Sequence, residues 1–201
     1  MIDLKGQVAL IVGAGHGPGK LIASQLGAAG ATLALNDQLP GPIETLADEF
    51  GPAARAFPGD SAKKLSAQSL VQDVLEAYER IDLFVFANAV LPQDTILAMD
   101  EWDWRHALNL NLTSAFLMLQ TVGRVLRELG GGRILVVVDQ PGETGAPASA
   151  AYRTAAAALR GLTQAATEEF GAYNIDVHIL EAAGLPAALD AALQGDSHAQ
   201  K

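Results

Sequence analysis

The chain has 201 residues, half of them hydrophobic and 18% charged, with a formal net charge of −10. This composition predicts a globular chain, long enough for one α/β domain, and argues against intrinsic disorder. The negative charge argues against nucleic acid and anionic membranes as partners, and the absence of cysteine excludes disulfides, thiolate catalysis and cysteine-ligated metals.

No apolar run reaches the ~18 residues of a membrane span, and residues 1–6 lack the basic and apolar regions of a signal peptide. We therefore expect a cytoplasmic protein with no membrane partner. The histidines have no pair at ligand spacing on one helix, so we expect no metal site. They are His16, His106, His178 and His198. His178 falls within an apolar strand and is interpreted as a satisfied core or edge residue.

The segment from Gln7 to Asp37 predicts a strand, a glycine-rich turn, a helix and a second strand with an acidic end. The first turn of such a βαβ unit can hold a dinucleotide pyrophosphate, because glycines let anionic oxygens approach the backbone at a helix N-terminus. A proline at the start of the helix has its φ already set for the first turn. The turn residues predicted to contact a cofactor are Gly13, Gly15, His16, Gly17, Pro18 and Gly19.

Asp37 is predicted to accept hydrogen bonds from the adenosine ribose hydroxyls and to repel a 2′-phosphate. No Arg or Lys follows it closely, so NAD is favoured over NADP as the cofactor. The turn has the spacing Gly13-x-x-x-Gly17-x-Gly19 and not G-x-G-x-x-G. A flexible turn that binds no cofactor is therefore the alternative.

Strands and helices alternate along the rest of the chain, which is typical of a parallel sheet covered by helices on both faces. Without a linker or repeat, residues 1–201 are predicted to form a single domain, with 185–201 as a short helix and polar tail. We expect further strands over 53–57, 81–87, 133–138 and 175–180. We expect further helices over 42–50, 63–79, 101–128, 147–170 and 186–193.

Several segments together resemble the short-chain dehydrogenase/reductase family. They are the glycine turn, Asp37, Asp60 with Ser61, the pair Asn88-Ala89 and the helical segment WRHALNLNLTSAF with Asn111. The resemblance covers most of the chain and implies a Rossmann-type sheet of about six strands in the order 3-2-1-4-5-6. It also implies an NAD(P)-binding oxidoreductase, with Asp60 at the residue that contacts the adenine amine.

The family's chemistry requires a Tyr, a Lys four residues later and a Ser about thirteen residues earlier. Tyr152 stands at the Tyr position, but Ala156 replaces the Lys and Asp139 replaces the Ser. An ammonium beside the phenol would lower its pKa and hold the nicotinamide ribose, and Ala156 does neither. Arg160, at offset eight, is turned by about 80° from Tyr152 and does not match the Lys position. The candidate catalytic residues are Tyr152, Asn111 and Asp139. The alternatives are a relic aromatic residue at a helix start for Tyr152 and a polar strand terminus, which is the favoured interpretation, for Asp139.

Beyond the sixth strand about twenty residues remain, where family members continue with a substrate-covering segment, so we expect an open substrate pocket. Two hypotheses follow. The first is a catalytically impaired relative that binds NAD, or only keeps the fold, and acts through association. Its helices 101–128 and 147–170 would form a homodimer or homotetramer, or would pair with a complete family member. The second is an active NAD-dependent oxidoreductase on a small carbonyl or alcohol, using Tyr152 and Asn111.

Overall fold

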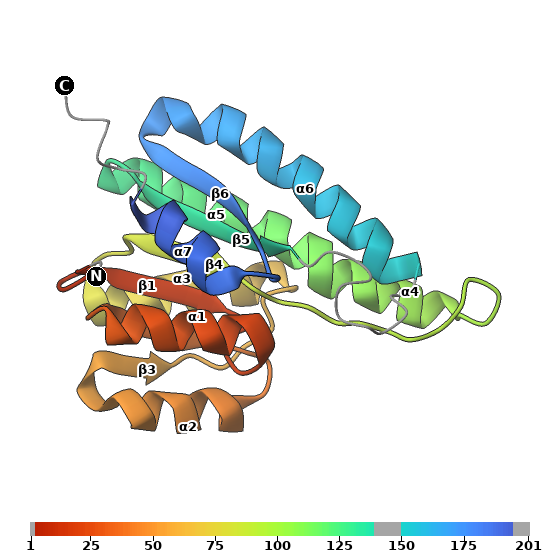
Figure 1. The fold of residues 1–201 in the computed structure, drawn as a ribbon, viewed down its shortest axis with the longest axis horizontal. Coiled ribbons are helices and arrows are strands. Elements are labelled where there is room, and N and C mark those ends of the chain that lie inside the picture. The colour runs from red at the N-terminus through yellow and green to blue at the C-terminus, as the bar shows by residue number, and fades with distance from the viewer. Residues whose placement is uncertain (1–2, 139–149, 195–201) are drawn as a thin grey trace.

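A computed structural model describes residues 3–138 and 150–194 (Figure 1). The described chain forms one six-stranded sheet in the order β3-β2-β1-β4-β5-β6, and every neighbouring pair of strands is parallel. The order 3-2-1-4-5-6 that the family resemblance implies is confirmed. From β1 the strand order runs in one direction to β3 and in the other to β6, so the order reverses between β1 and β4. Doubly wound folds bind their ligands at this point.

The strands follow the apolar segments of the sequence. Their bounds are β1 Val8–Val12, β2 Thr32–Asn36, β3 Ala54–Ala56, β4 Leu83–Phe86, β5 Gly132–Val138 and β6 Ile175–Glu181. Every residue of β1 and β4 is buried, as expected for central strands of a parallel sheet covered on both faces. The strand predicted over 81–87 is shorter, and the one predicted over 53–57 is reduced to three residues.

The helices cover both faces of the sheet. Their bounds are α1 Gly17–Ala28, α2 Pro40–Phe50, α3 Lys64–Tyr78, α4 Glu101–Leu108, α5 Ser114–Leu129, α6 Ala150–Phe170 and α7 Leu185–Gln194. Two separate apolar clusters lie on the two faces of the sheet. Leu10 and Phe84 point to the cluster formed with α3, α5 and α6, whereas Ile11 and Val85 point to the one formed with α1, α2 and α7.

The single helix predicted over 101–128 is interrupted. Residues Asn109–Thr113 form a turn of π-helix between α4 and α5, so the backbone widens around Asn111. Such turns are rare and often occur at functional sites. A period of apolar residues does not reveal one extra residue in a single turn, so the sequence pattern could not predict this interruption. Of the helix predicted over 147–170, residues 147–149 lie outside the described residues.

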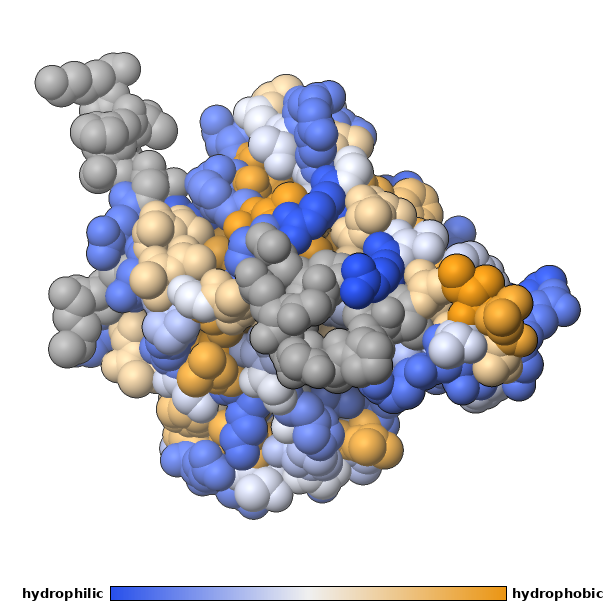
Figure 2. Space-filling model, turned by 45° about the vertical axis from the view of Figure 1, so that its right-hand side comes forward, coloured by the Kyte–Doolittle hydropathy of each residue, from blue (hydrophilic) through white to orange (hydrophobic). Residues whose placement is uncertain are grey.

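The surface carries an apolar patch beyond β4. Ile96 is 79% exposed and Leu97 fully exposed, and Trp102 at the start of α4 stacks on His106 with ring centroids 4.7 Å apart. Orange side chains stand out at that end of the molecule in Figure 2. No helix among the described residues is long and apolar enough to span a membrane.

Candidate functional site

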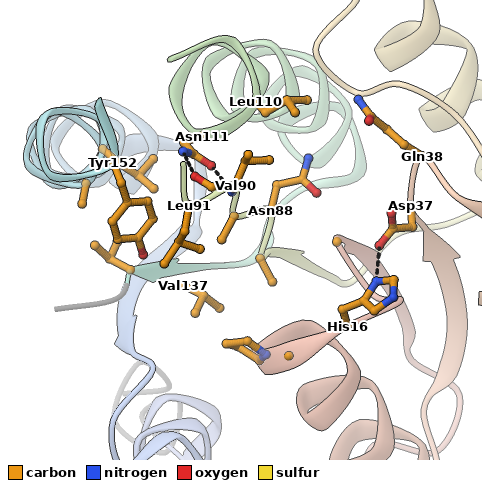
Figure 3. A pocket seen from close by; sticks show the side chains of 18 residues that line it. His16, Asp37, Gln38, Asn88, Val90, Leu91, Leu110, Asn111, Val137 and Tyr152 are labelled. Atoms are coloured by element: carbon orange, nitrogen blue, oxygen red, sulfur yellow. Dashed lines mark hydrogen bonds and ion pairs between the residues drawn. The ribbon is translucent and has the colours of Figure 1, made fainter. Parts of the chain in front are cut away.

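A cavity of about 300 Å³ opens at the carboxyl ends of β1, β4 and β5 (Figure 3). The described residues that line it come from both halves of the sheet. They are Gly13, His16, Gly17, Pro18, Asp37, Gln38, Ala87, Asn88, Ala89, Val90, Leu91, Leu110, Asn111, Val137, Val138, Tyr152, Ala156 and Leu159. The structure therefore brings the predicted glycine turn, Asp37, Asn88, Asn111 and Tyr152 to one place.

In the glycine turn between β1 and α1, backbone segments lie so close together that a side chain would not fit between them. A Cβ on Gly19 would lie 2.0 Å from the carbonyl oxygen of Gly13, and one on Gly13 would lie 2.7 Å from the backbone nitrogen of Asn88. Gly17 has φ of +49° and begins α1, with Pro18 in its first turn. A Cβ on Gly17 would meet nothing within 4 Å, so the space next to the helix N-terminus is open to an anionic group.

Asp37 follows β2 and is joined to the glycine turn. Its Oδ2 accepts a hydrogen bond from the backbone N–H of Gly15 at 3.1 Å and lies 3.9 Å from Nδ1 of His16. Its Oδ1 accepts from the N–H of Leu39 at 3.4 Å. A carboxylate has about four acceptor positions, so these bonds leave capacity for two ribose hydroxyls. The side chain is mostly buried, with 17% of its surface exposed, and it lines the cavity.

Asp60 is not among the residues that line the cavity, but its side chain contacts Gln38, which is. Its Oδ1 accepts hydrogen bonds from Gln38 Nε2 and from the N–H of Ala62, both at 3.0 Å, and Lys63 lies 3.3 Å from Oδ2. Burial raises the pKa of Asp60, but these hydrogen bonds outweigh it, and the net effect is a pKa below the ordinary value. The charged carboxylate thereby orients the Gln38 amide, which lines the cavity.

Ser61 is buried behind Asn88. Nδ2 of Asn88 donates to its Oγ at 3.0 Å, which connects the loop after β3 to the loop after β4. Asn36, which sequence reasoning missed, adds a second connection of this kind. Its buried Nδ2 donates to the carbonyl oxygens of Phe57 at 2.7 Å and Gly59 at 3.2 Å. The sequence signal that could have revealed Asn36 is its place as a polar residue at the end of an otherwise largely apolar strand.

Asn111 lies in the π-helical turn and holds the loop after β4. Its Nδ2 donates to the carbonyl oxygen of Val90 at 2.8 Å, and its Oδ1 accepts from the N–H of Val90 at 2.6 Å. Figure 3 shows both bonds between the two residues. The side chain amide is thus engaged by the protein backbone, and the residue positions the cavity wall.

Tyr152 reaches the cavity from the first turns of α6 and is 5% exposed. One helical turn further, Ala156 also lines the cavity and presents a methyl group where the family pattern has an ammonium. Among the described lining residues, only Asp37 carries a fixed charge, and His16 carries one when protonated. Asp139, the third predicted catalytic residue, lies outside the described residues.

Arg160 connects α6 to the end of β6. Its guanidinium forms two hydrogen bonds to the carboxylate of Glu181, at 2.5 and 2.8 Å. The hydrogen bonds to Glu181 raise the pKa of Arg160, burial lowers it, and attraction to Glu181 and to ionised Tyr152 raises it further. Arg160 does not match the Lys position by its helical offset, and its hydrogen-bond partner in the structure is Glu181.

These residues define a dinucleotide-binding class of α/β protein, with a glycine turn, an acidic residue after β2 and a cavity at the switch point. Within residues 3–138 and 150–194, no three His, Asp or Glu side chains gather as metal ligands would.

Comparison with known proteins places the chain within one family. The model of the short chain dehydrogenase family matches residues 7–197. An uncharacterized oxidoreductase of Thermotoga maritima is 31% identical over 181 residues, covering 88% of this chain and 71% of that protein. A 3-oxoacyl-[acyl-carrier-protein] reductase of Synechocystis is 31% identical over 183 residues, covering 89% and 74%. The chain belongs to the short-chain dehydrogenase/reductase family.

Solved structures agree with this assignment. The crystal structure of a candidate short-chain dehydrogenase/reductase from Burkholderia xenovorans superposes with a TM-score of 0.83 at 29% identity. It is matched over 89% of this chain and 74% of its own length. The family is one of oxidoreductases and generally binds NAD(P), which agrees with the fold and the cavity described above.

Proposed function

We propose that the protein binds NAD(H), has weak or no hydride-transfer chemistry, and acts through association with a second copy or with a complete family member. The preference for NAD rests on Asp37, whose mostly buried carboxylate faces the cavity beside the glycine turn. A dinucleotide with a 2′-phosphate would bring a second negative charge to this carboxylate. NADP is therefore the weaker ligand in this proposal.

The proposal rests on one observation, that Ala156 lines the cavity where the family pattern has a Lys. A free phenol has a pKa of about 10, so roughly one molecule in a thousand is a phenolate at pH 7. Tyr152 needs that form to accept a proton from an alcohol, and a neighbouring ammonium would make it more abundant. The methyl group of Ala156 has no charge and no donor, so it neither promotes the phenolate nor binds a ribose hydroxyl.

The alternative is an active NAD-dependent oxidoreductase on a small carbonyl or alcohol, and the retained pair of Tyr152 and Asn111 at the cavity is the observation that favours it. Neutral Tyr152 can donate a proton to a carbonyl, and Asn111 keeps the neighbouring loop in place. The guanidinium of Arg160 is held by two hydrogen bonds to the carboxylate of Glu181, so it does not replace the missing Lys. This arrangement supports slow carbonyl reduction better than alcohol oxidation.

Cofactor turnover separates the two candidates. The wild type is compared with Asp139→Ser/Ala156→Lys in a screen of small carbonyls and alcohols, following NADH absorbance. In the first proposal turnover appears only in the double variant; brisk wild-type turnover supports the second. Circular dichroism melts of both proteins verify that the variant is folded.

Association is supported by the outer face of α5 and α6. A groove of about 250 Å³ runs between these helices and is lined by Phe116, Leu119, Leu162, Phe170 and Tyr173, together with Arg124 and Arg127. Phe116 is 46% exposed, which is high for a phenylalanine on a helix. The exposed small side chains of Ala157 and Ala158 would allow a partner helix to approach α6 closely.

A further inference from the structure

The two ends of the cavity differ in what they offer a ligand. The end beside β2 holds a charged carboxylate, an oriented amide and an amide supported by Ser61, from Asp37, Gln38 and Asn88 respectively. The middle is the glycine turn, where Gly17 leaves open space at the start of α1. Acceptors for ribose hydroxyls, an acceptor for an amino group and backbone donors for phosphate are the groups that an adenosine diphosphate requires.

At the other end of the cavity, the side chains that the structure describes are largely apolar. Its described lining includes Leu91, Val137, Ala156 and Leu159, with Tyr152 among them. The side chain of Asn111, the amide nearest to this end, already exchanges two hydrogen bonds with the backbone of Val90. A second ribose placed here would exchange its water for side chains that offer few hydrogen bonds, and such a transfer gains little free energy.

We infer that this cavity recognises the adenosine diphosphate half of its ligand and draws little affinity from the nicotinamide ribose half. The inference rests on the proposed NAD(H) binding and deepens it by naming the ligand class as adenosine diphosphates with a variable second half. NADH, ADP-ribose and ADP then bind with similar affinity. A protein with this property responds to the total adenosine diphosphate pool and distinguishes poorly between oxidised and reduced dinucleotide.

The experiment is a calorimetric titration of the full chain with NADH, NAD⁺, ADP-ribose, ADP and nicotinamide mononucleotide. ADP-ribose against NADH isolates the nicotinamide, and ADP against ADP-ribose isolates the second ribose. We expect the dissociation constants of the four adenine ligands to agree within about threefold, and nicotinamide mononucleotide to bind about 100-fold more weakly.

Two variants test the two ends separately. Asp37→Asn weakens all adenine ligands by a similar factor of about ten, since it acts on the half they share. Ala156→Lys restores a donor for the second ribose, so it tightens ADP-ribose and NADH about tenfold and leaves ADP unchanged. The ligand series on the wild type decides the question even if a lysine at this buried position prevents folding.

The outcomes are distinct. If wild-type protein binds NADH tenfold or more tightly than ADP-ribose, the inference is wrong while NAD(H) binding stands. If nicotinamide mononucleotide binds as well as ADP, the inference is wrong as well. If no adenine ligand binds at millimolar concentration, the inference and the proposed cofactor binding fail together.

Discussion

The side chain amide of Asn111 makes a reciprocal pair of hydrogen bonds, at 2.6 and 2.8 Å, with the backbone N–H and carbonyl of Val90. The two residues lie on different segments, a π-helical turn and the loop after β4. The pair connects the π-helical turn beside the cavity to the loop after β4, which forms part of the cavity wall. It also satisfies two polar backbone groups that would otherwise have to find other partners in a partly buried position.

Asn111→Ala removes both bonds and leaves the N–H and carbonyl of Val90 without them. We expect a loss of about 2 kcal/mol in the free energy of unfolding, measured by urea denaturation. Asn109→Ala is the matched control, because Asn109 lies in the same π-helical turn but is exposed. It should change stability by less than about 0.5 kcal/mol. Equal losses in the two variants would contradict the role given to the Val90 pair.

Much of the fold follows from the sequence because its strands are short apolar segments bounded by turns. The βαβ unit was predictable from alternation and from the glycine turn together with Asp37, and the strand order from the resemblance to the short-chain dehydrogenase/reductase family. The π-helical turn at Asn111 was not, since a period of apolar residues does not reveal one extra residue in a single turn. The Val90 pair and the connection from Asn88 to Ser61 were also out of reach, because both join segments that are distant in sequence.

Two glycines of the turn are expected to serve different purposes. Gly19 is needed for stability, and Gly17 for cofactor binding. Gly19→Ala places a Cβ 2.0 Å from the Gly13 carbonyl oxygen, so the backbone must shift, and we expect a loss above about 3 kcal/mol. Gly17→Ala meets no atom within 4 Å, so its cost is limited to the strain of φ at +49°, about 1 kcal/mol. The Gly17 variant stays folded but binds NADH about tenfold more weakly. Thermal melts and calorimetry provide the two readouts, and equal destabilisation would contradict the assignment.

Asp60 makes stability depend on acid pH. Its pKa is lowered in the folded chain, since hydrogen bonds from Ala62, Gln38 and Lys63 outweigh the opposing effect of burial. A lowered folded pKa stabilises the chain above the ordinary value of 3.8 and loses that contribution as pH falls through the folded value. Asp60→Asn should therefore flatten the fall in stability below pH 3.8, followed by urea denaturation at several pH values. Asp73→Asn, at an exposed position of α3, corrects for the loss of one negative charge. An unchanged acid slope in the Asp60 variant would refute this account.

Asp37 is expected to set the choice between dinucleotides. Asp37→Asn keeps an oxygen that can accept from the Gly15 N–H but removes the charge that opposes a 2′-phosphate. The ratio of NADPH to NADH dissociation constants should fall by about tenfold in this variant, a change of about 1.4 kcal/mol in discrimination. Calorimetry with both dinucleotides measures it. A ratio that stays at its wild-type value would assign the discrimination to another residue.

Phe116 tests whether the outer face of α5 and α6 is an interface. The side chain lines the groove between the two helices and is 46% exposed, so a partner helix placed there would bury it. Phe116→Arg would leave a charge inside such an interface, and loss of the oligomer is expected, measured by size-exclusion chromatography with light scattering. Leu65→Arg is the control, because Leu65 is 77% exposed on α3 and is not among the residues that line this groove. It should keep the wild-type mass.

If the wild type is a monomer at the highest concentration tested, self-association fails, and the same pair of variants then tests binding to a complete family member. If Phe116→Arg leaves an oligomeric mass unchanged, the interface lies elsewhere on the molecule.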